Sequence, residues 1–145
     1  MAIEFVLLFP VFILVMLGAL YFAFAFNTQR SLVFVAQSGA DAALRVDRSQ
    51  FDLSGEAGRS AYLTRMRDEA CDVMRPLLAR QSRTVVGSLE GMDCPGSEGV
   101  NSISIEPADD GAPVILIAIE VEPAWRPPLV SQFITTISGS ASVPF

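Results

Sequence analysis

The side chains best suited to chemistry are few in this sequence. Histidine and lysine are absent, and the only cysteines are Cys71 and Cys94. Histidine titrates near neutral pH and, together with cysteine, supplies most zinc sites. The carboxylates stand singly or in loop-like clusters, and Asp109 and Asp110 beside Gly111 are more typical of a solvated turn than of a calcium site. We therefore expect no catalytic residue, no bound metal and no cofactor.

The state of the two cysteines depends on the compartment that they face. In an oxidising compartment, Cys71 and Cys94 are expected to form one disulfide. Closing a loop of this length stabilises a fold by about 3 kcal/mol if the effect is chain entropy. The alternative is two unrelated buried thiols in a cytoplasmic domain.

One carboxylate, Glu4, stands at the edge of a long apolar segment. Residues 5–26 carry no charge, and as a helix they extend about 33 Å, slightly more than the hydrocarbon core of a bilayer. A secretory signal peptide has a basic start, a shorter apolar stretch and a small-residue cleavage site, and this segment fits none of the three. The segment is therefore predicted to span a membrane.

The remainder of the chain is long enough for one compact domain. We expect an N-terminal membrane or filament-core helix over residues 1–48 and a head domain over residues 49–145. The net charge is −6, and most of the acidic residues lie in the head. Because an acidic surface repels phosphate groups, nucleic acid is not expected as a partner.

The N-terminal helix is predicted to continue beyond the apolar segment, because residues 27–46 contain no proline and one glycine. Apolar and small residues recur there at steps of three and four, on one side of the helix. They are Leu32, Val35, Ala36, Gly39, Ala40, Ala43 and Val46. Small residues four apart, such as Ala36 and Ala40, let another helix approach closely. A plain alanine-rich solvated face is the alternative.

A second, amphipathic helix is predicted after a polar connection at residues 47–58, with Ser54 or Ser60 as its cap. Its expected apolar stripe consists of Tyr62, Met66, Ala70, Val73 and Leu77. Pro76 is expected to bend or end this helix near Arg75, because proline removes a backbone hydrogen bond. Cys71 lies one step off the stripe, so a disulfide would tie the loop that contains Cys94 to this helix.

The hydrophobic period then changes from 3.6 to 2, which is typical of strands. Apolar residues alternate with other residues in two runs, at Ile103 and Ile105 and then at Ile115, Ile117, Ile119 and Val121. A turn-like stretch with proline and glycine separates the runs, which predicts a β-hairpin. A third strand is expected over residues 130–137 and a fourth from Ser140. The fold class is therefore α+β: a long N-terminal hydrophobic helix continues into a small head with a second helix and a small antiparallel β-sheet.

The start of the chain carries a specific pattern: Ala2, Ile3, Glu4, Phe5 and Pro10, an apolar run, and then an alanine-rich phrase at residues 37–43. Over residues 1–45 the chain resembles the TadE-like family of pseudopilins, minor subunits of the tight-adherence (Tad) branch of type IV pili. The resemblance implies a structural, non-enzymatic subunit of an extracellular filament, with its first helix in the filament core.

The same resemblance implies partners and a location. The partners would be copies of the chain or other pilins, the membrane before assembly, a prepilin peptidase and the pilus assembly machinery. Before assembly the chain would lie in the inner membrane with its head outside the cytoplasm. After assembly it would lie in an extracellular pilus, a filament that serves roles such as cell adhesion.

The resemblance also gives Glu4 a role in assembly and register, together with Met1, Phe5 and Pro10. Pilin-like precursors are cut just ahead of the apolar segment, and the acid is thought to pair with the freed α-amino group of its own or a neighbouring chain. An ionised carboxylate at mid-bilayer costs about 2.5 to 3.5 kcal/mol, and a nearby amine offsets that cost. Type IV pilins usually carry the acid at the fifth mature position and this chain carries it at the fourth, so either the chain is mature or slightly shortened, or its processing differs. Alternatively, Glu4 simply lies in the headgroup layer.

Pro10 removes a hydrogen bond to the carbonyl of Val6 and is expected to kink or loosen the helix, which is tolerable where other helices pack around it. Gly18 is expected to open a shallow groove for helix packing, and the aromatic residues after it would form either a membrane belt or an interlock in a fibre. Two other hypotheses compete with that of a minor subunit. In the first, the chain is a main filament subunit. In the second, it is a monomeric single-pass anchor that holds a binding module outside the cytoplasm.

Overall fold

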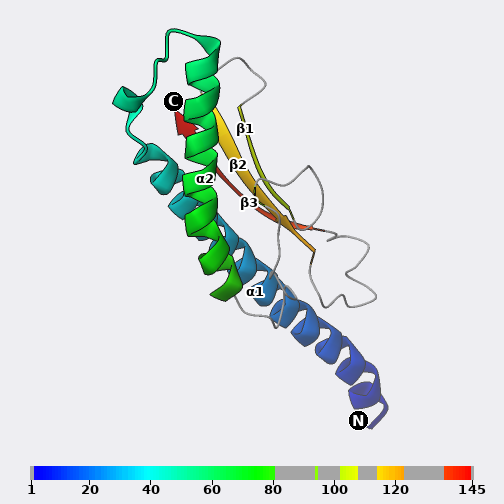
Figure 1. Ribbon diagram of the computed structural model, residues 1–145. Coiled ribbons are helices and arrows are strands. Elements are labelled where there is room, and N and C mark those ends of the chain that lie inside the picture. The colour runs from blue at the N-terminus through cyan, green and yellow to red at the C-terminus, as the bar shows by residue number, and fades with distance from the viewer. Residues whose placement is uncertain (1, 81–93, 95–101, 108–113, 123–135, 145) are drawn as a thin grey trace.

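The computed structural model describes residues 2–80, 94, 102–107, 114–122 and 136–144 (Figure 1). Helix α1 (Ala2–Leu44) is followed by a short 3-10 helix, η1 (Arg48–Gln50), and by helix α2 (Glu56–Arg80). Strands β1 (Ser102–Pro107), β2 (Val114–Val121) and β3 (Ile137–Pro144) form one antiparallel sheet in the order β1-β2-β3. The predicted α+β fold, with a long first helix, a second helix and a small sheet, is confirmed.

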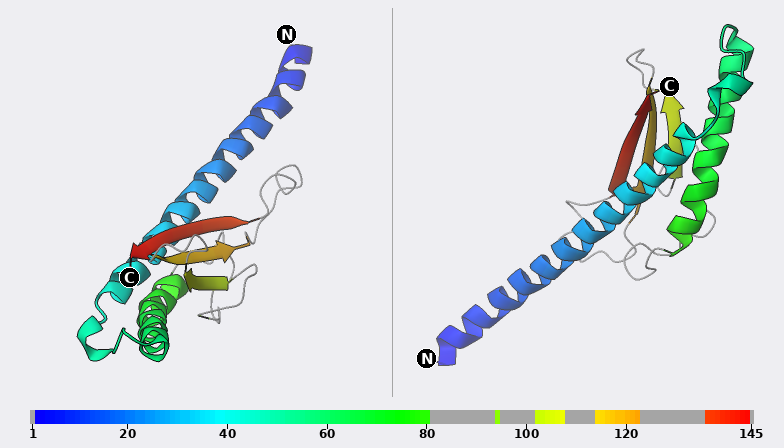
Figure 2. Two further views of the ribbon diagram at one scale, coloured as in Figure 1. Left: turned by 90° about the horizontal axis from the view of Figure 1, so that it is seen from above. Right: turned by 90° about the vertical axis from the view of Figure 1, so that its left-hand side faces the viewer.

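Helix α1 forms the long axis of the molecule. Its N-terminal half extends away from the other elements (Figure 1), and its C-terminal half lies between α2 on one side and β3 on the other (Figure 2). One helix therefore belongs to two environments. The C-terminal half of α1 shares one hydrophobic core with α2 and the sheet. The predicted division of the chain into a helix and a head after residue 48 stays a prediction.

The C-terminal half of α1 supplies the centre of that core. The predicted stripe is buried from Leu32 to Ala43, and Leu32 and Val35 expose 1% and 0% of their surface. Val46, the last residue of the stripe, is partly buried. Each fully buried leucine or valine side chain contributes about 1.5–3 kcal/mol through removal of apolar surface from water. The burial of this stripe fixes α1 to the head.

The polar connection between the helices is built from two similar carboxylate turns. Asp47 caps η1 and accepts hydrogen bonds from the Ser49 backbone N–H and hydroxyl, at 2.9 and 2.8 Å. Asp52 accepts the same two bonds from Ser54. Helix α2 begins at Glu56, so the predicted cap at Ser60 is wrong, and the Ser54 hydroxyl bonds to Asp52 rather than to the helix.

The buried side of α2 differs from the predicted stripe in its second half. Tyr62, Met66 and Ala70 are buried as predicted, but Val73 and Leu77 are only partly buried. Cys71, Met74 and Leu78 are buried instead. Tyr62, Met66, Ala70, Met74 and Leu78 follow one another at steps of four, and such a row winds slowly around a helix axis. The contact surface follows this row across α1 rather than a straight line.

Pro76 does not end α2, which continues to Arg80. The missing N–H would have bonded the carbonyl of Asp72, and both residues are exposed, so water can satisfy the freed group. The expected end of the helix near Arg75 is therefore wrong, because a proline on the solvent side of a helix costs less than one inside a protein.

The hairpin of β1 and β2 has the predicted alternation. Ile103 is opposite Ile119 and Ile105 is opposite Ile117, and all four are buried on the side of the sheet that faces the core. Such cross-strand pairs of β-branched residues are the main stabilising contacts of a small sheet.

The predictions for the end of the chain are partly wrong. Residues 130–135 of the expected third strand lie outside the described residues, and one strand, β3, covers Ile137–Pro144, including the fourth strand that was expected from Ser140. The serine- and glycine-rich sequence of β3 is poor in strand-forming residues. Its register with β2, with Ile137 opposite Val121 and Val143 opposite Ile115, places its few apolar residues on the core side.

Candidate assembly interface

The N-terminal half of α1 is apolar and exposed. From Phe5 to Phe26 its large side chains are mostly about half to two thirds exposed, with Phe5 at 66% and Phe22 at 67%. The helix is long and apolar enough to cross a membrane. Soluble monomers rarely expose an apolar surface larger than a few hundred Å². This surface therefore has to be covered by lipid or by other protein.

One side of this segment already faces the head at its C-terminal end. Tyr21 and Thr28 are 5% and 9% exposed, and Ala25 between them is partly buried. The Thr28 hydroxyl donates to the Phe24 carbonyl at 3.0 Å, so this polar side chain is satisfied within the helix. The head therefore overlaps the last turns of the apolar segment along one side, while the opposite side stays open.

The aromatic residues of the open side form contacts along the helix. The ring centroids of Phe5 and Phe9 are 5.7 Å apart, and those of Phe22 and Phe26 are 6.3 Å apart. The guanidinium of Arg30, the first charged group after the apolar segment, lies 5.7 Å from the centre of the Phe26 ring. A cation over an aromatic ring is a weakly stabilising contact that fits the edge of an apolar surface.

Two of the residues predicted to act in assembly, Phe5 and Pro10, lie in the exposed N-terminal part of α1. Met1 and the side chain of Glu4 lie outside the described part of the chain, so the pairing of Glu4 with a terminal amine stays a prediction. Phe5 and Pro10 are exposed, and α1 is continuous through Pro10. A Cβ placed on Gly18 would meet no atom within 4 Å, so the surface there is open.

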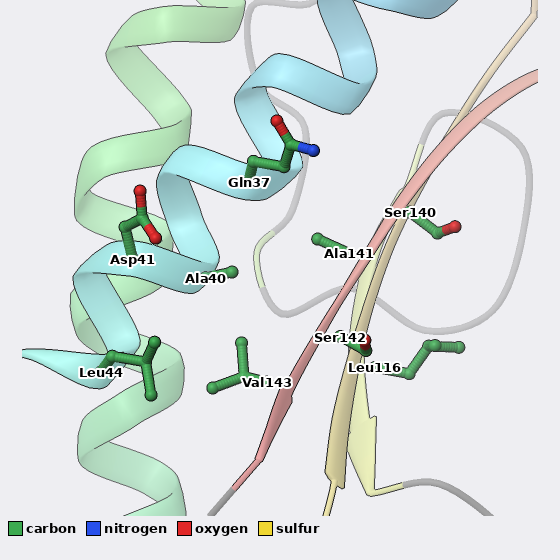
Figure 3. Close-up of a pocket in the computed structure, with 9 residues that line it drawn as sticks. All are labelled: Gln37, Ala40, Asp41, Leu44, Leu116, Ser140, Ala141, Ser142 and Val143. Carbon is green, nitrogen blue, oxygen red and sulfur yellow. The ribbon is translucent and has the colours of Figure 1, made fainter.

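The small residues in the C-terminal half of α1 are used within the chain. Ala36, Ala40 and Ala43 are buried in the core of the head. A Cβ on Gly39 would lie 2.6 Å from the sulfur of Met74, so α2 approaches α1 closely at this glycine. The helix that Gly39 accommodates is the chain's own α2, and Ala40 faces β3 (Figure 3). Among the predicted packing residues, Gly18 remains available to another chain.

Comparison with known proteins identifies this helix. Residues 1–41 match the family model described as TadE-like protein. Most of α1 is thus similar to the TadE-like family. The match supports the interpretation that the chain is a component of a tight-adherence (Tad) pilus system with a membrane-type helix at its N-terminus. It ends within α1, so α2 and the sheet lie beyond the matched residues. No curated protein and no solved structure matches the chain.

Beyond its apolar segment, the TadE-like helix borders a hollow of about 450 Å³ (Figure 3). Helix α1 lines it with Gln37, Ala40, Asp41 and Leu44, and the sheet lines it with Leu116 and residues 140–143. Leu44 and Leu116 are 53% and 46% exposed, which is unusual for leucines next to a core. Sequence reasoning missed this hollow, because it joins three segments that are far apart in the chain.

The predicted disulfide is present between Cys71 of α2 and Cys94, with Cα atoms 5.7 Å apart. Both residues are buried, and the Arg75 guanidinium donates to the Cys94 carbonyl at 3.1 Å. The segment around Cys94 is therefore attached to α2 twice, one helical turn apart. The second attachment was not predicted, since an arginine four residues after a cysteine carries no specific signal.

Nothing in the described part of the chain resembles a catalytic centre. No cluster of three or more metal-ligating side chains occurs there. The two resolved pKa shifts belong to Asp47 and Asp52, whose pKa values are lowered because the hydroxyl and N–H of Ser49 and Ser54 donate to the ionised carboxylates. These carboxylates stabilise exposed turns. The feature that requires a function is the exposed surface of the TadE-like helix.

Proposed function

We propose that this chain is a structural, pilin-like subunit of a Tad-type filament. Its N-terminal helix is held in the membrane before assembly and packs against the helices of other subunits in the filament core afterwards. The observation that carries the proposal is the apolar surface of residues 5–26, which the described head covers on one side only. A lipid-facing surface that also packs against other helices suits a subunit that leaves the bilayer for a fibre.

The continuity of α1 supports a structural role. The same helix carries the exposed apolar surface and the centre of the head's core, so a subunit that packs through its N-terminal half carries its head in a fixed orientation. A minor or tip position is supported by the resemblance to TadE-like pseudopilins described above. The small acidic head then faces outward, outside the cytoplasm, with the disulfide in an oxidising compartment.

Within this proposal, Glu4 sets the axial register. A carboxylate at the edge of an apolar helix is disfavoured in lipid unless a cation pairs with it. A terminal amine of the same or a neighbouring subunit supplies that cation, so only one axial position of the subunit satisfies both charges. Phe5 and Pro10, which follow on the same exposed end, pack against the neighbouring helices.

The test replaces Glu4 with alanine in cells that produce the filament. We expect the Glu4→Ala chain to reach the membrane at the normal level and to be reduced at least tenfold in sheared surface filaments, both measured by immunoblotting. Glu56→Ala, which removes an exposed carboxylate from the start of α2, is the matched control and should assemble normally.

A Glu4→Ala chain that enters filaments as well as the unchanged chain would contradict the register role. If the unchanged chain never appears in sheared filaments and is recovered only as single copies in the membrane, the proposal that it is a filament subunit is wrong. A single-pass anchor for a binding module is then the better account.

A further inference from the structure

The C-terminal half of α1 keeps one side that the described part of the head does not cover. Phe34 is 59% exposed and Leu44 is 53% exposed on this half, although Val35 and Ala43 beside them are buried. Two charged residues, Arg30 and Asp41, are exposed on the same half. A large aromatic side chain exposed between two charges is more typical of an interface than of a solvated helix face.

Arg30 and Asp41 lie on the same side of α1. They are eleven residues apart, which is close to three turns of 3.6 residues and corresponds to about 16 Å along the axis. Their side chains are too far apart to pair with each other, and neither forms an ion pair with a described residue of the chain. Each charge is therefore available to a partner, and the two charges are opposite in sign.

We propose that this side of α1 binds a second copy of the chain, parallel to the first and displaced by about three helical turns, so that Arg30 of one copy pairs with Asp41 of the next. The proposal rests on the filament subunit proposed above and adds a register that Glu4 does not determine. Two parallel helices without displacement would place Arg30 against Arg30 and Asp41 against Asp41. The displacement converts two repulsions into an attraction.

The surface around Asp41 supports a second copy as the occupant. The hollow there is lined by Asp41 and Leu44 of α1 and by residues of β2 and β3. In Figure 3 the Asp41 carboxylate points away from the strands, on the open side of α1, and Leu44, one turn further along, is 53% exposed. An arginine fits beside these two residues, because its aliphatic stem packs on Leu44 while its guanidinium reaches the Asp41 carboxylate. The chain exposes such an arginine at the position that the displacement requires.

The same displacement accounts for Phe34. Moved by eleven residues, Phe34 of one copy comes level with Arg45 of the other, immediately after Leu44 at the edge of the hollow. A ring at this position covers exposed leucine and lies close to a cation, and both contacts favour binding. One register thus covers Phe34 and Leu44 and pairs both charges.

Cysteine cross-linking tests the register without altering Arg30 or Asp41. Asn27 and Ser38 are also eleven residues apart, and each is at least partly exposed. Two differently tagged full-length chains, one with Asn27→Cys and one with Ser38→Cys, are produced together in the filament-forming cells and treated with a short bis-maleimide. We expect a dimer that carries both tags, at least tenfold more abundant than the dimers from cells that produce Asn27→Cys alone or Ser38→Cys alone.

Charge reversal then tests the ion pair within the same assay. Arg30→Glu in the Asn27→Cys chain should lower the yield of the mixed dimer at least fivefold. Adding Asp41→Arg to the Ser38→Cys chain should restore it to within about twofold of the original, because the pair is re-formed with its charges exchanged. Filament content, followed separately by immunoblotting of sheared material, reports on the proposed function itself.

Several results would overturn this register. They are a mixed dimer no more abundant than the single-variant dimers, a mixed dimer that is indifferent to Arg30→Glu, a failure of Asp41→Arg to restore it, or capture of a different protein at position 38. If these results occur while the chain is still present in filaments, the proposal that the chain is a filament subunit is unaffected and only the displaced pairing is wrong. A loss of membrane insertion with Arg30→Glu would assign Arg30 to lipid headgroups instead.

Discussion

Gly139 of β3 lies directly against the backbone of Leu32 in α1. A Cβ atom on Gly139 would be 2.7 Å from the carbonyl carbon of Leu32 and 2.7 Å from the backbone nitrogen of Val33. Real Cβ atoms do not approach backbone atoms so closely, and a backbone cannot move aside as the end of a flexible side chain can. This glycine therefore sets the distance between the sheet and the helix on which the head is built.

Gly139→Ala should destabilise the head. The added methyl group forces β3 away from α1 and should cost about 1–3 kcal/mol, the usual range for overpacking a core. The measurement is chemical denaturation of the full-length chain in detergent, followed by circular dichroism. Gly55→Ala is the matched control, since a Cβ there meets no atom within 4 Å. An unchanged midpoint for Gly139→Ala would show that β3 does not rest on α1 as described.

Gly18→Leu should separate assembly from folding. The open surface at Gly18 leaves room for a leucine side chain within the monomer, so the unfolding midpoint of the head should not change. A large side chain would, however, keep neighbouring helices apart, and incorporation into filaments should fall at least fivefold. The amount of the chain in sheared filaments and in membranes is compared by immunoblotting. Leu20→Met is the control, since it changes a nearby exposed side chain without changing its size much. Normal incorporation of Gly18→Leu would exclude Gly18 from the contact surface.

Removal of the disulfide should destabilise the head by more than the loss of the packing contacts of the two side chains. Cys71→Ala with Cys94→Ala opens a loop whose ends are 23 residues apart and should lower stability by about 3 kcal/mol. Reduction of the unchanged chain should have a similar effect, while the double variant should not respond to reductant. Denaturation with and without reductant checks this. A reductant response in the double variant, or none in the unchanged chain, would contradict the prediction.

Acid should weaken the connection between the helices. Folding lowers the pKa of Asp47 and Asp52 below their ordinary value of 3.8, because Ser49 and Ser54 donate hydrogen bonds to the ionised carboxylates. The stabilisation is therefore complete above pH 3.8 and is lost as the pH falls through the lower pKa of the folded state. A chain with Asp47→Asn and Asp52→Asn should lose less stability in this interval than the unchanged chain. Thermal melts at successive pH values compare the two, and parallel pH profiles would refute the assignment.

Several parts of the fold could be predicted because local pattern and tertiary burial agree. The stripe from Leu32 to Ala43 and the alternation of Ile115, Ile117 and Ile119 are read directly from helical and strand periods. The disulfide was predictable because two cysteines allow one pairing. In each case the residues that decide the structure are close in sequence or the only ones of their kind.

Other parts could not be predicted, because distant segments determine them. Gly139 reads as a loop residue until α1 lies beside it, and then it is the residue that a close contact requires. Met74 and Leu78 are buried rather than Val73 and Leu77 because α2 crosses α1 along a row of residues four apart. Sequence directed attention to the apolar segment and to Glu4. Phe34 and the hollow near Asp41 became evident only once helix and sheet were placed together.

The absence of any break in α1 between Ala2 and Leu44 has a mechanical consequence. Beyond Pro10, where every residue of α1 keeps its backbone N–H, tension is transmitted along the helix to Leu32 and Val35, at the centre of the head. A subunit under load thus behaves as a stiff rod whose far end is embedded in its own globule. Tilting that rod therefore loads the contact between Leu32 and Gly139 of β3.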